Sequence, residues 1–275
     1  MDIEPQLVKF FHKEEAKRKP GYIGLEYACR QKKDGVYGFI EIEDGKVVGP
    51  FSKKGNKLKG LEYQIQQESE NLEFAIAKSM IKNGRLIFEI RDWLDKEDFY
   101  TVNGLTKRHK NQKMRFFIHD LLDWEMPREK GWERENSLFM ISNHLPEGFE
   151  VLPVLYEGRD INKMMELYRS GVEKGWEGIV MKCLSTEYRP GARDYSLMKM
   201  KAETKIPNCK LIRHVPGEGN GAMLLVSQNG IEFPVAGIDE TLYNQLMQGK
   251  SPKIFDVLCM SINKSGKPRE PRLCK

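Results

Sequence analysis

The sequence has 275 residues, a length that suits two domains better than one. Hydrophobic residues make up 40% and charged residues 31%, which supports a packed core and excludes a globally disordered chain. No apolar run approaches the roughly 20 residues that cross a bilayer, and the N-terminus lacks the basic-then-apolar order of a secretory signal, so we expect a cytoplasmic protein with no membrane partner.

Charge and cysteine content narrow the class of protein further. The formal charge is +5, and the stretch from Lys205 to the C-terminus carries 10 lysines and arginines against 6 acidic residues. This excess suggests a C-terminal module that lies against phosphates. The cysteines include no C-x-x-C pair, so we expect reduced thiols rather than a disulfide framework or a structural zinc site.

Hydrophobic periodicity gives the elements of the larger, N-terminal part, which reads as mixed α+β. The first 20 residues read as a short helix or a fraying end, and the segment 39–48 reads as a β-hairpin that turns at Asp44-Gly45. Apolar residues at helical spacing predict helices over 61–83 and 161–175. Further strands are predicted in apolar segments, at 85–93, 114–124 and 177–184.

The C-terminal part has a different pattern, and we place the boundary after Thr204. Short strand candidates separated by Gly, Asn and Pro lie at 210–215, 221–237 and 255–263. One helical stretch, 239–249, interrupts them. This pattern is typical of a compact antiparallel β module.

The segment from Lys32 to Gly35 has the arrangement K-x-D-G. A lysine amine can attack the α-phosphorus of a nucleotide when it is neutral and in line, and Gly35 permits a tight turn close to a phosphate. Taken alone, the tetrapeptide favours a solvated surface turn, because such turns commonly use these residue types.

Further segments follow in a fixed order and weaken that interpretation. A basic loop, two apolar strands and a strand start present charged or aromatic side chains, namely Lys53, Glu89, Phe117, His119 and Glu177. Beyond them, Lys199 and Lys201 alternate with two methionines, so both lysines point to one side of a strand. A triphosphate explains two cations on one strand face better than packing does.

In this order the segments resemble those of the ATP-dependent DNA ligases, in the covalent nucleotidyltransferase superfamily that also holds RNA ligases and mRNA capping enzymes. The similarity runs from about Tyr22 to the C-terminus. It implies an α+β fold in which a nucleotidyltransferase (adenylation) domain, residues 1–204, precedes a small β-barrel OB-fold domain, residues 205–275. It also implies a minimal ligase, since no separate DNA-binding domain fits before the catalytic core.

The resemblance implies a role for each of these residues. Lys32, rather than its neighbour Lys33, would be the catalytic nucleophile that takes AMP from ATP, with Lys199 and Lys201 assisting at the α-phosphate. Glu89 and Glu177 would contact the ribose and a divalent metal, Mg²⁺. The other nucleotide contacts would come from Lys53 and from Phe117 or His119, one of which would stack on adenine.

Some positions depart from the family pattern. Tyr37 stands where arginine is common, and Lys53 offers a point charge where the family usually has an arginine fork. Glu89 follows Ile87-Phe88 rather than Asp-Gly, which makes it a weaker assignment than Glu177. His119 replaces the usual Phe or Tyr before the acid, so the adenine-stacking role is divided between two residues.

The expected partner is nicked duplex DNA, bound by a monomer. The basic tail would contact DNA through Lys264, Lys267, Arg269 and Arg272. An RNA ligase with the same first step, an mRNA capping guanylyltransferase and a non-catalytic OB-type nucleic-acid binder are the alternatives. The last would not need Lys32, Glu177 and the two strand lysines together.

Overall fold

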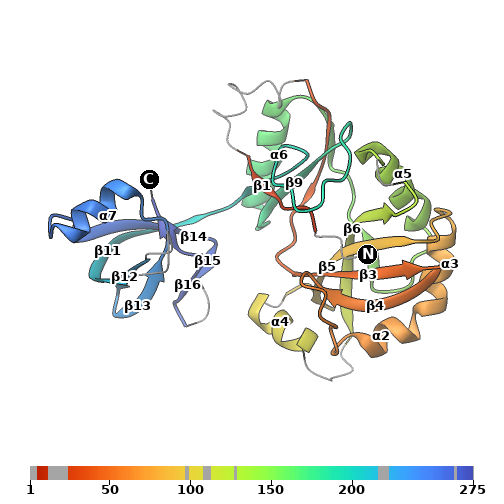
Figure 1. Cartoon of the computed structure of the whole chain (residues 1–275), viewed down its shortest axis with the longest axis horizontal. Helices are drawn as coiled ribbons and strands as arrows, with labels where there is room; N and C mark the ends of the chain where they lie inside the picture. Colours follow the sequence, from red (N-terminus) through yellow and green to blue (C-terminus); the bar gives the residue numbers. More distant parts are fainter. Residues whose placement is uncertain are drawn as a thin grey trace. The chain divides into compact units, whose positions relative to one another are not determined.

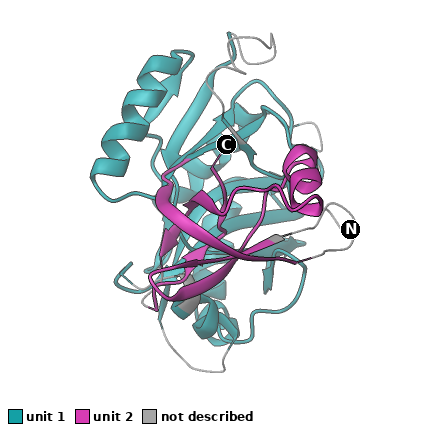
Figure 2. Cartoon of the chain, turned by 90° about the vertical axis from the view of Figure 1, so that its left-hand side faces the viewer, with its two compact units in different colours: residues 1–200 teal, residues 201–275 magenta. Residues whose placement is uncertain are grey.

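The structure, a computed structural model, describes residues 5–11, 24–96, 99–107, 113–126, 129–215, 223–262 and 265–274. The chain divides into unit 1, residues 1–200, and unit 2, residues 201–275 (Figure 2). No helix in the described ranges is long and apolar enough to span a membrane. Each unit is described below by itself.

The larger sheet of unit 1, sheet B, has the strand order β4-β3-β5-β6-β7 (Figure 1). Its members are β3 (Val36–Glu43), β4 (Lys46–Ser52), β5 (Gly84–Asp92), β6 (Met114–Asp123) and β7 (Phe149–Val151). The hairpin predicted over 39–48 and the strands predicted over 85–93 and 114–124 are confirmed. Asp44 and Gly45, at φ 49° and 76°, both adopt the left-handed backbone that a two-residue type I′ turn requires.

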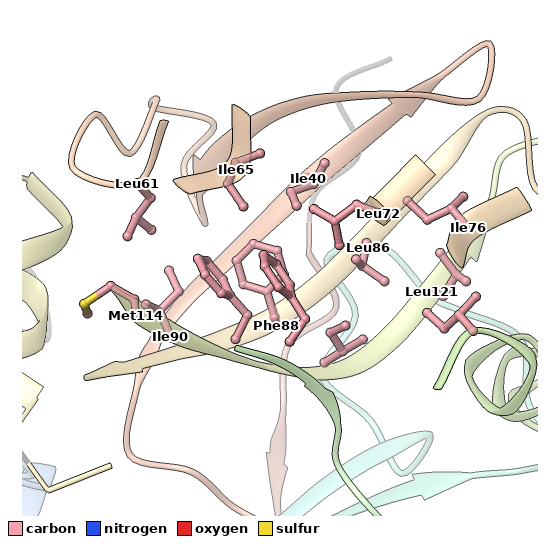
Figure 3. Packing of buried hydrophobic residues seen from close by; sticks show 14 of the residues in the cluster. Ile40, Leu61, Ile65, Leu72, Ile76, Leu86, Phe88, Ile90, Met114 and Leu121 are labelled. Atoms are coloured by element: carbon pink, nitrogen blue, oxygen red, sulfur yellow. The ribbon is translucent and has the colours of Figure 1, made fainter. Parts of the chain in front are cut away.

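One face of sheet B forms the main hydrophobic core. Helices α2 (Glu62–Gln67) and α3 (Ser69–Ala77) contact β4, α4 (Phe99–Lys107) contacts β5, and α5 (Gly131–Ser142) contacts β6. Figure 3 shows Phe88 at the centre of this core. Its ring meets Phe116 edge-on at 5.1 Å, and a side chain at Gly38 would come within 2.7 Å of it. Gly38 therefore leaves the room that Phe88 fills.

The single helix predicted over 61–83 is wrong, because the chain forms two helices that break at Glu68. At the break the Ser69 hydroxyl donates to the carbonyl of Gln66 at 2.9 Å. A local bond of this kind competes with the backbone bonds of a continuous helix. Helical spacing reports the buried face but does not reveal this interruption.

The second sheet of unit 1, sheet A, has the order β1-β10-β9-β2-β8. Its strands are β1 (Lys9–Phe10), β2 (Tyr27–Gln31), β8 (Tyr156–Gly158), β9 (Gly178–Cys183) and β10 (Leu197–Lys201). Helix α6 (Ile161–Glu173) confirms the helix predicted over 161–175. It is capped by the Asp160 carboxylate and contacts β8 and β9. The expected helix or frayed end at the N-terminus is wrong for residues 9–10, which pair with β10 in parallel.

Unit 2 is a β module with one helix, α7 (Glu240–Met247), capped by Asp239. Its main sheet has the order β13-β12-β11-β14-β17. The strands are β11 (Thr204–Val215), β12 (Met223–Gln228), β13 (Ile231–Val235), β14 (Ile254–Cys259) and β17 (Arg272–Leu273), and a small hairpin joins β15 (Ser261–Ile262) to β16 (Pro268–Arg269).

The two edges of the unit 2 sheet meet. The amide of Ala236, next to β13, donates to the carbonyl of Pro271 at 3.1 Å, and the amide of Leu273 donates back to Ala236 at 3.0 Å. The two edges are therefore joined at one isolated bridge, between Ala236 and Arg272. Phe233, Val235 and Val257 are buried in the core of unit 2.

Replacing Phe88 by alanine should lower the free energy of unfolding by about 3–5 kcal/mol, because the fully buried ring would leave a cavity. Urea denaturation measures this change. Phe74→Ala is the matched control, since that ring is 57% exposed, and it should cost less than about 1 kcal/mol. Equal costs for the two substitutions would contradict the assigned core.

Candidate active site

The face of sheet B that points away from the main core carries a row of polar and aromatic side chains. Tyr37 of β3 lies opposite Glu89 of β5, and Glu89 lies opposite Phe117 of β6. Because side chains alternate along a strand, the burial of Phe88 and Phe116 in the core turns Glu89 and Phe117 to this other face.

Sheet A presents a charged face of its own. Met181 of β9 and Met198 of β10 pack in the core beneath α6, so Lys182 and Lys199 lie on the opposite face by alternation. The Lys182 amine donates to the backbone carbonyl of His119 on β6 at 2.9 Å. This contact shows that the charged face of sheet A is turned toward sheet B.

Lys32 follows β2 directly and lies beside the start of β9. Its amide donates to the carbonyl of Gly178 at 2.9 Å, and its amine lies 2.5 Å from Oε2 of Glu177. Both side chains are largely buried, at 18% and 10% exposed. The antiparallel pairing of β2 with β9 thus brings together two residues that are 145 positions apart in the sequence.

Gly35 lies flat against β5. A side chain there would come within 2.6 Å of the Ile90 carbonyl and 3.2 Å of Oε2 of Glu89. The turn therefore tolerates only glycine, and it places the Glu89 carboxylate beside the K-x-D-G segment. The sequence prediction that Glu89 and Lys32 belong to one site fits this position.

His119 occupies a β-bulge. The pairing of β5 with β6 shifts between Ile87 and Phe88, so that His119 has no partner and Asp120 lies opposite Ile87. Burial lowers the pKa of His119 to about 4, which keeps the ring neutral at pH 7. Its centroid lies 6.2 Å from that of Tyr37. A neutral imidazole and a phenol therefore lie together on this face.

Asp120 belongs to a buried network of charges that the sequence did not indicate. Its Oδ1 accepts from the Lys182 amine at 2.9 Å and from Nε of Arg134 at 3.0 Å. Lys182 also lies 3.0 Å from Glu135, which Arg30 of β2 binds through its guanidinium. Burial opposes ionisation of Asp120, but Arg134 and Lys182 outweigh it and lower the pKa of its carboxyl group to about 2.

The ring of Phe117 lies between two cations. The Lys33 amine is 4.1 Å from its centroid and the Arg115 guanidinium is 5.0 Å from it. Phe117 is only 2% exposed. Lys33 therefore points across Phe117, away from the Lys32–Glu177 pair, and ends on Asp95 at 2.6 Å.

The remaining predicted nucleotide contacts lie in different places. Lys53 is exposed in the loop after β4, and Lys199 lies on the charged face of sheet A. Lys201 belongs to unit 2, where its amine lies 2.7 Å from Sδ of Met260 and 3.9 Å from Glu270.

Of the four cations predicted to contact DNA, three lie among the described residues. Lys267 is exposed and Arg269 half-buried at the β15–β16 hairpin. Arg272 forms a bidentate ion pair with Glu203, at 2.6 and 2.7 Å. Lys264 lies outside the described residues. Arg272 therefore already has an acidic partner within unit 2.

The carboxylates beside the K-x-D-G segment suit a metal ion that takes some ligands from the protein and the rest from a substrate. In the part of the chain that the structure describes, no group of three or more His, Cys, Asp or Glu side chains could hold a metal. Mg²⁺ is usually bound by one or two carboxylates together with substrate phosphates. Glu177 and Glu89 each lie beside the K-x-D-G segment and could bind Mg²⁺ in this way.

Residues 5–201 match the family described as "ATP dependent DNA ligase domain". The chain belongs to this ligase family. A DNA ligase of Methanothermobacter thermautotrophicus is 28% identical over 131 residues, which are 46% of this chain and 23% of that protein. The match therefore spans about a quarter of that relative's length.

Two solved ligase structures share the fold over nearly the whole chain. A Lig E DNA ligase, studied for DNA binding with a minimal scaffold, covers 100% of this chain and 99% of its own at a TM-score of 0.68 and 19% identity. The ATP-dependent DNA ligase of bacteriophage T7, in complex with ATP, covers 98% of each chain at 0.60 and 16%. At these identities the likeness shows the fold alone.

The buried network of this ligase-family chain should make its stability depend on acid pH. The pKa of Asp120 is lowered in the folded state, so its carboxylate stabilises the fold above the unfolded pKa of about 3.9, and this contribution disappears as the pH falls toward about 2. Asp120→Asn should therefore cost about 3 kcal/mol at pH 7, and progressively less below about pH 4.

Urea denaturation of both proteins across this pH range checks the prediction. Asp256→Asn is the control, because the Asp256–Lys205 pair is more than one-third exposed and should contribute less than about 1 kcal/mol. A cost of Asp120→Asn that does not change between pH 7 and pH 3 would contradict the assigned charge state.

Proposed function

We propose that this chain is an ATP-dependent DNA ligase that seals 5′-phosphate/3′-hydroxyl nicks in duplex DNA through a covalent Lys32–AMP intermediate. The observation that carries the proposal is the largely buried pair of the Lys32 amine and the Glu177 carboxylate, between the charged face of sheet A and the aromatic face of sheet B. A domain that only bound nucleic acid would not need a nucleophile in this position.

The reaction has three steps. The Lys32 amine attacks the α-phosphorus of ATP, the N–P bond forms and pyrophosphate leaves. The AMP group then passes to the 5′-phosphate of the nick. Finally, the 3′-hydroxyl attacks that phosphate, the strand is sealed and AMP is released. Lys199 and Lys201 are proposed to offset charge at the α-phosphate, and Lys53 to contact the nucleotide.

The Lys32–Glu177 pair holds the nucleophile in place. The Lys32 amine lies 2.5 Å from the Glu177 carboxylate, and the amine must be unprotonated to attack phosphorus. Glu177 and Glu89 would hold Mg²⁺ together with substrate phosphates, and the metal ion would neutralise phosphate charge.

We propose that His119, rather than Phe117, stacks on adenine. Phe117 is buried and has Lys33 over its ring at 4.1 Å. His119 projects from the bulge beside Tyr37, and its neutral ring can stack without adding charge to the base-binding face.

Unit 2 is proposed to be the OB-fold domain and to close on the DNA. We place the hinge at Ala202, because Glu203 is tied to Arg272 and Thr204 already pairs with Cys259 at the start of β11. This position is two residues earlier than Thr204, after which the sequence predicts the domain boundary. Lys201 is the last residue of β10 and precedes this hinge, so movement at Ala202 would separate its amine from Met260.

Lys32→Ala should abolish covalent labelling by ATP, because the alanine side chain has no amine to form the phosphoramidate bond. Lys33→Ala should keep much of the labelling after a long incubation, since the Lys33 amine contacts Asp95 and is not the nucleophile. Incubation with labelled ATP and, separately, labelled GTP, followed by denaturing electrophoresis, measures both. Label retained in Lys32→Ala would contradict the assignment of Lys32 as the nucleophile. Preference for GTP over ATP would favour a capping enzyme.

Binding to nicked DNA should weaken steeply with salt. Each neutralised phosphate adds about 0.9 to the slope of log affinity against log salt concentration. The double substitution Lys267→Gln with Arg269→Gln should therefore lower the slope by up to about 1.8. Lys250→Gln, an exposed cation of the same unit, serves as the control. An unchanged slope in the double variant would show that the β15–β16 hairpin is not on the DNA path.

A further inference from the structure

We propose that Lys33, Arg91 and Asp95 form an ionic latch that positions Lys32 for attack, so that these three are positioning residues of self-adenylation. The proposal rests on the proposed function, and it concerns side chains that touch neither the Lys32 amine nor Glu177 in the described contacts. It explains why the variable position of the K-x-D-G segment holds a second lysine.

The latch converges on one carboxylate. Oδ2 of Asp95 accepts from the Lys33 amine at 2.6 Å, and Oδ1 accepts from Nε of Arg91 at 2.7 Å. Nη1 of Arg91 donates onward to the backbone carbonyl of Asp34 at 2.5 Å. The side chain of Lys33 is thus bonded to Asp95 directly, and the backbone of Asp34 is linked to Asp95 through Arg91.

These ion pairs are largely buried, so they can fix the positions of the side chains that form them. The side chains of Lys33, Arg91 and Asp95 are 13%, 10% and 25% exposed, so water screens them far less than it screens Lys46, which is 73% exposed in its pair with Glu73. Arginine also holds its partners in a planar fork rather than as a point charge.

Asp95 is itself well anchored. Its amide donates to the carbonyl of Asp92 at 3.0 Å, in the turn that follows β5. The carboxylate of Asp92 accepts from the amide of Lys96 at 3.0 Å. The residue therefore lies just beyond the end of β5, the central strand of sheet B, and the latch connects the nucleophile segment to that strand.

The latch leaves the Lys32 side chain as the movable part of the segment. On one side the Lys32 amide is bonded to Gly178 of β9. On the other side Gly35 is pressed against the Ile90 carbonyl, and Lys33 and Asp34 are tied to Asp95. A nucleophile whose backbone is fixed loses less freedom on reaching the attack geometry, which raises the rate of the chemical step rather than the affinity for substrate.

The test measures single-turnover self-adenylation of the full chain over a range of ATP concentrations. Lys33→Met should lower the rate constant at saturating ATP by about tenfold and change the half-saturating ATP concentration by less than about threefold. Lys33→Arg, which keeps a cation for Asp95, should recover most of the rate. Combining Lys33→Met with Asp95→Asn should be little slower than the slower single variant, because both break the same contact.

Lys46→Met provides the matched control, because it removes a lysine from an ion pair with Glu73 that lies away from the K-x-D-G segment. It should keep the wild-type rate. A wild-type rate in Lys33→Met, with or without a lower Tm, would overturn the latch and leave the proposed function standing. Absence of covalent AMP in the wild-type protein would overturn both proposals.

Discussion

The two sheets of unit 1 are joined by a buried ion pair between Lys182 of β9 and Asp120 of β6, and the arrangement of the site follows from this contact. Neither charge can be left without its partner in the interior, because an unpaired buried charge costs several kcal/mol. Arg134 supplies a second cation to Asp120, and Glu135 a second anion to Lys182. Together these bonds fix the spacing of the two faces between which a nucleotide would bind.

This arrangement separates two tasks that a self-adenylating enzyme has to combine. The charges that connect the sheets are satisfied by each other, whereas the Lys32 amine pairs with a carboxylate that a metal ion could share. Aromatic and imidazole rings on sheet B then offer an uncharged surface for a base, at Tyr37 and His119. The candidate site thus combines the Lys32–Glu177 ion pair with two uncharged rings on sheet B.

Interactions between residues close in the chain made part of the fold predictable from sequence. The hairpin turn at Asp44-Gly45 and the helix capped by Asp160 depend on residues close in the chain, and both predictions are confirmed. The β-bulge at His119 and the network around Lys182 depend on the pairing of distant strands, which a single sequence does not specify. Lys201 is a further case, because alternation predicts which way it points but not that Met260 lies next to it. The catalytic and DNA-contact roles carried over from the ligase resemblance stay predictions.

The most direct test of this account is to locate the AMP group on the chain. The full-length protein would be incubated with ATP and Mg²⁺, digested with a protease and mapped by tandem mass spectrometry under conditions that preserve the phosphoramidate bond. The account predicts a single adenylated peptide with AMP on Lys32, and loss of the modification when nicked DNA is added. AMP on another residue, Lys33 included, or a chain that remains unmodified while it seals nicks with ATP, would contradict it.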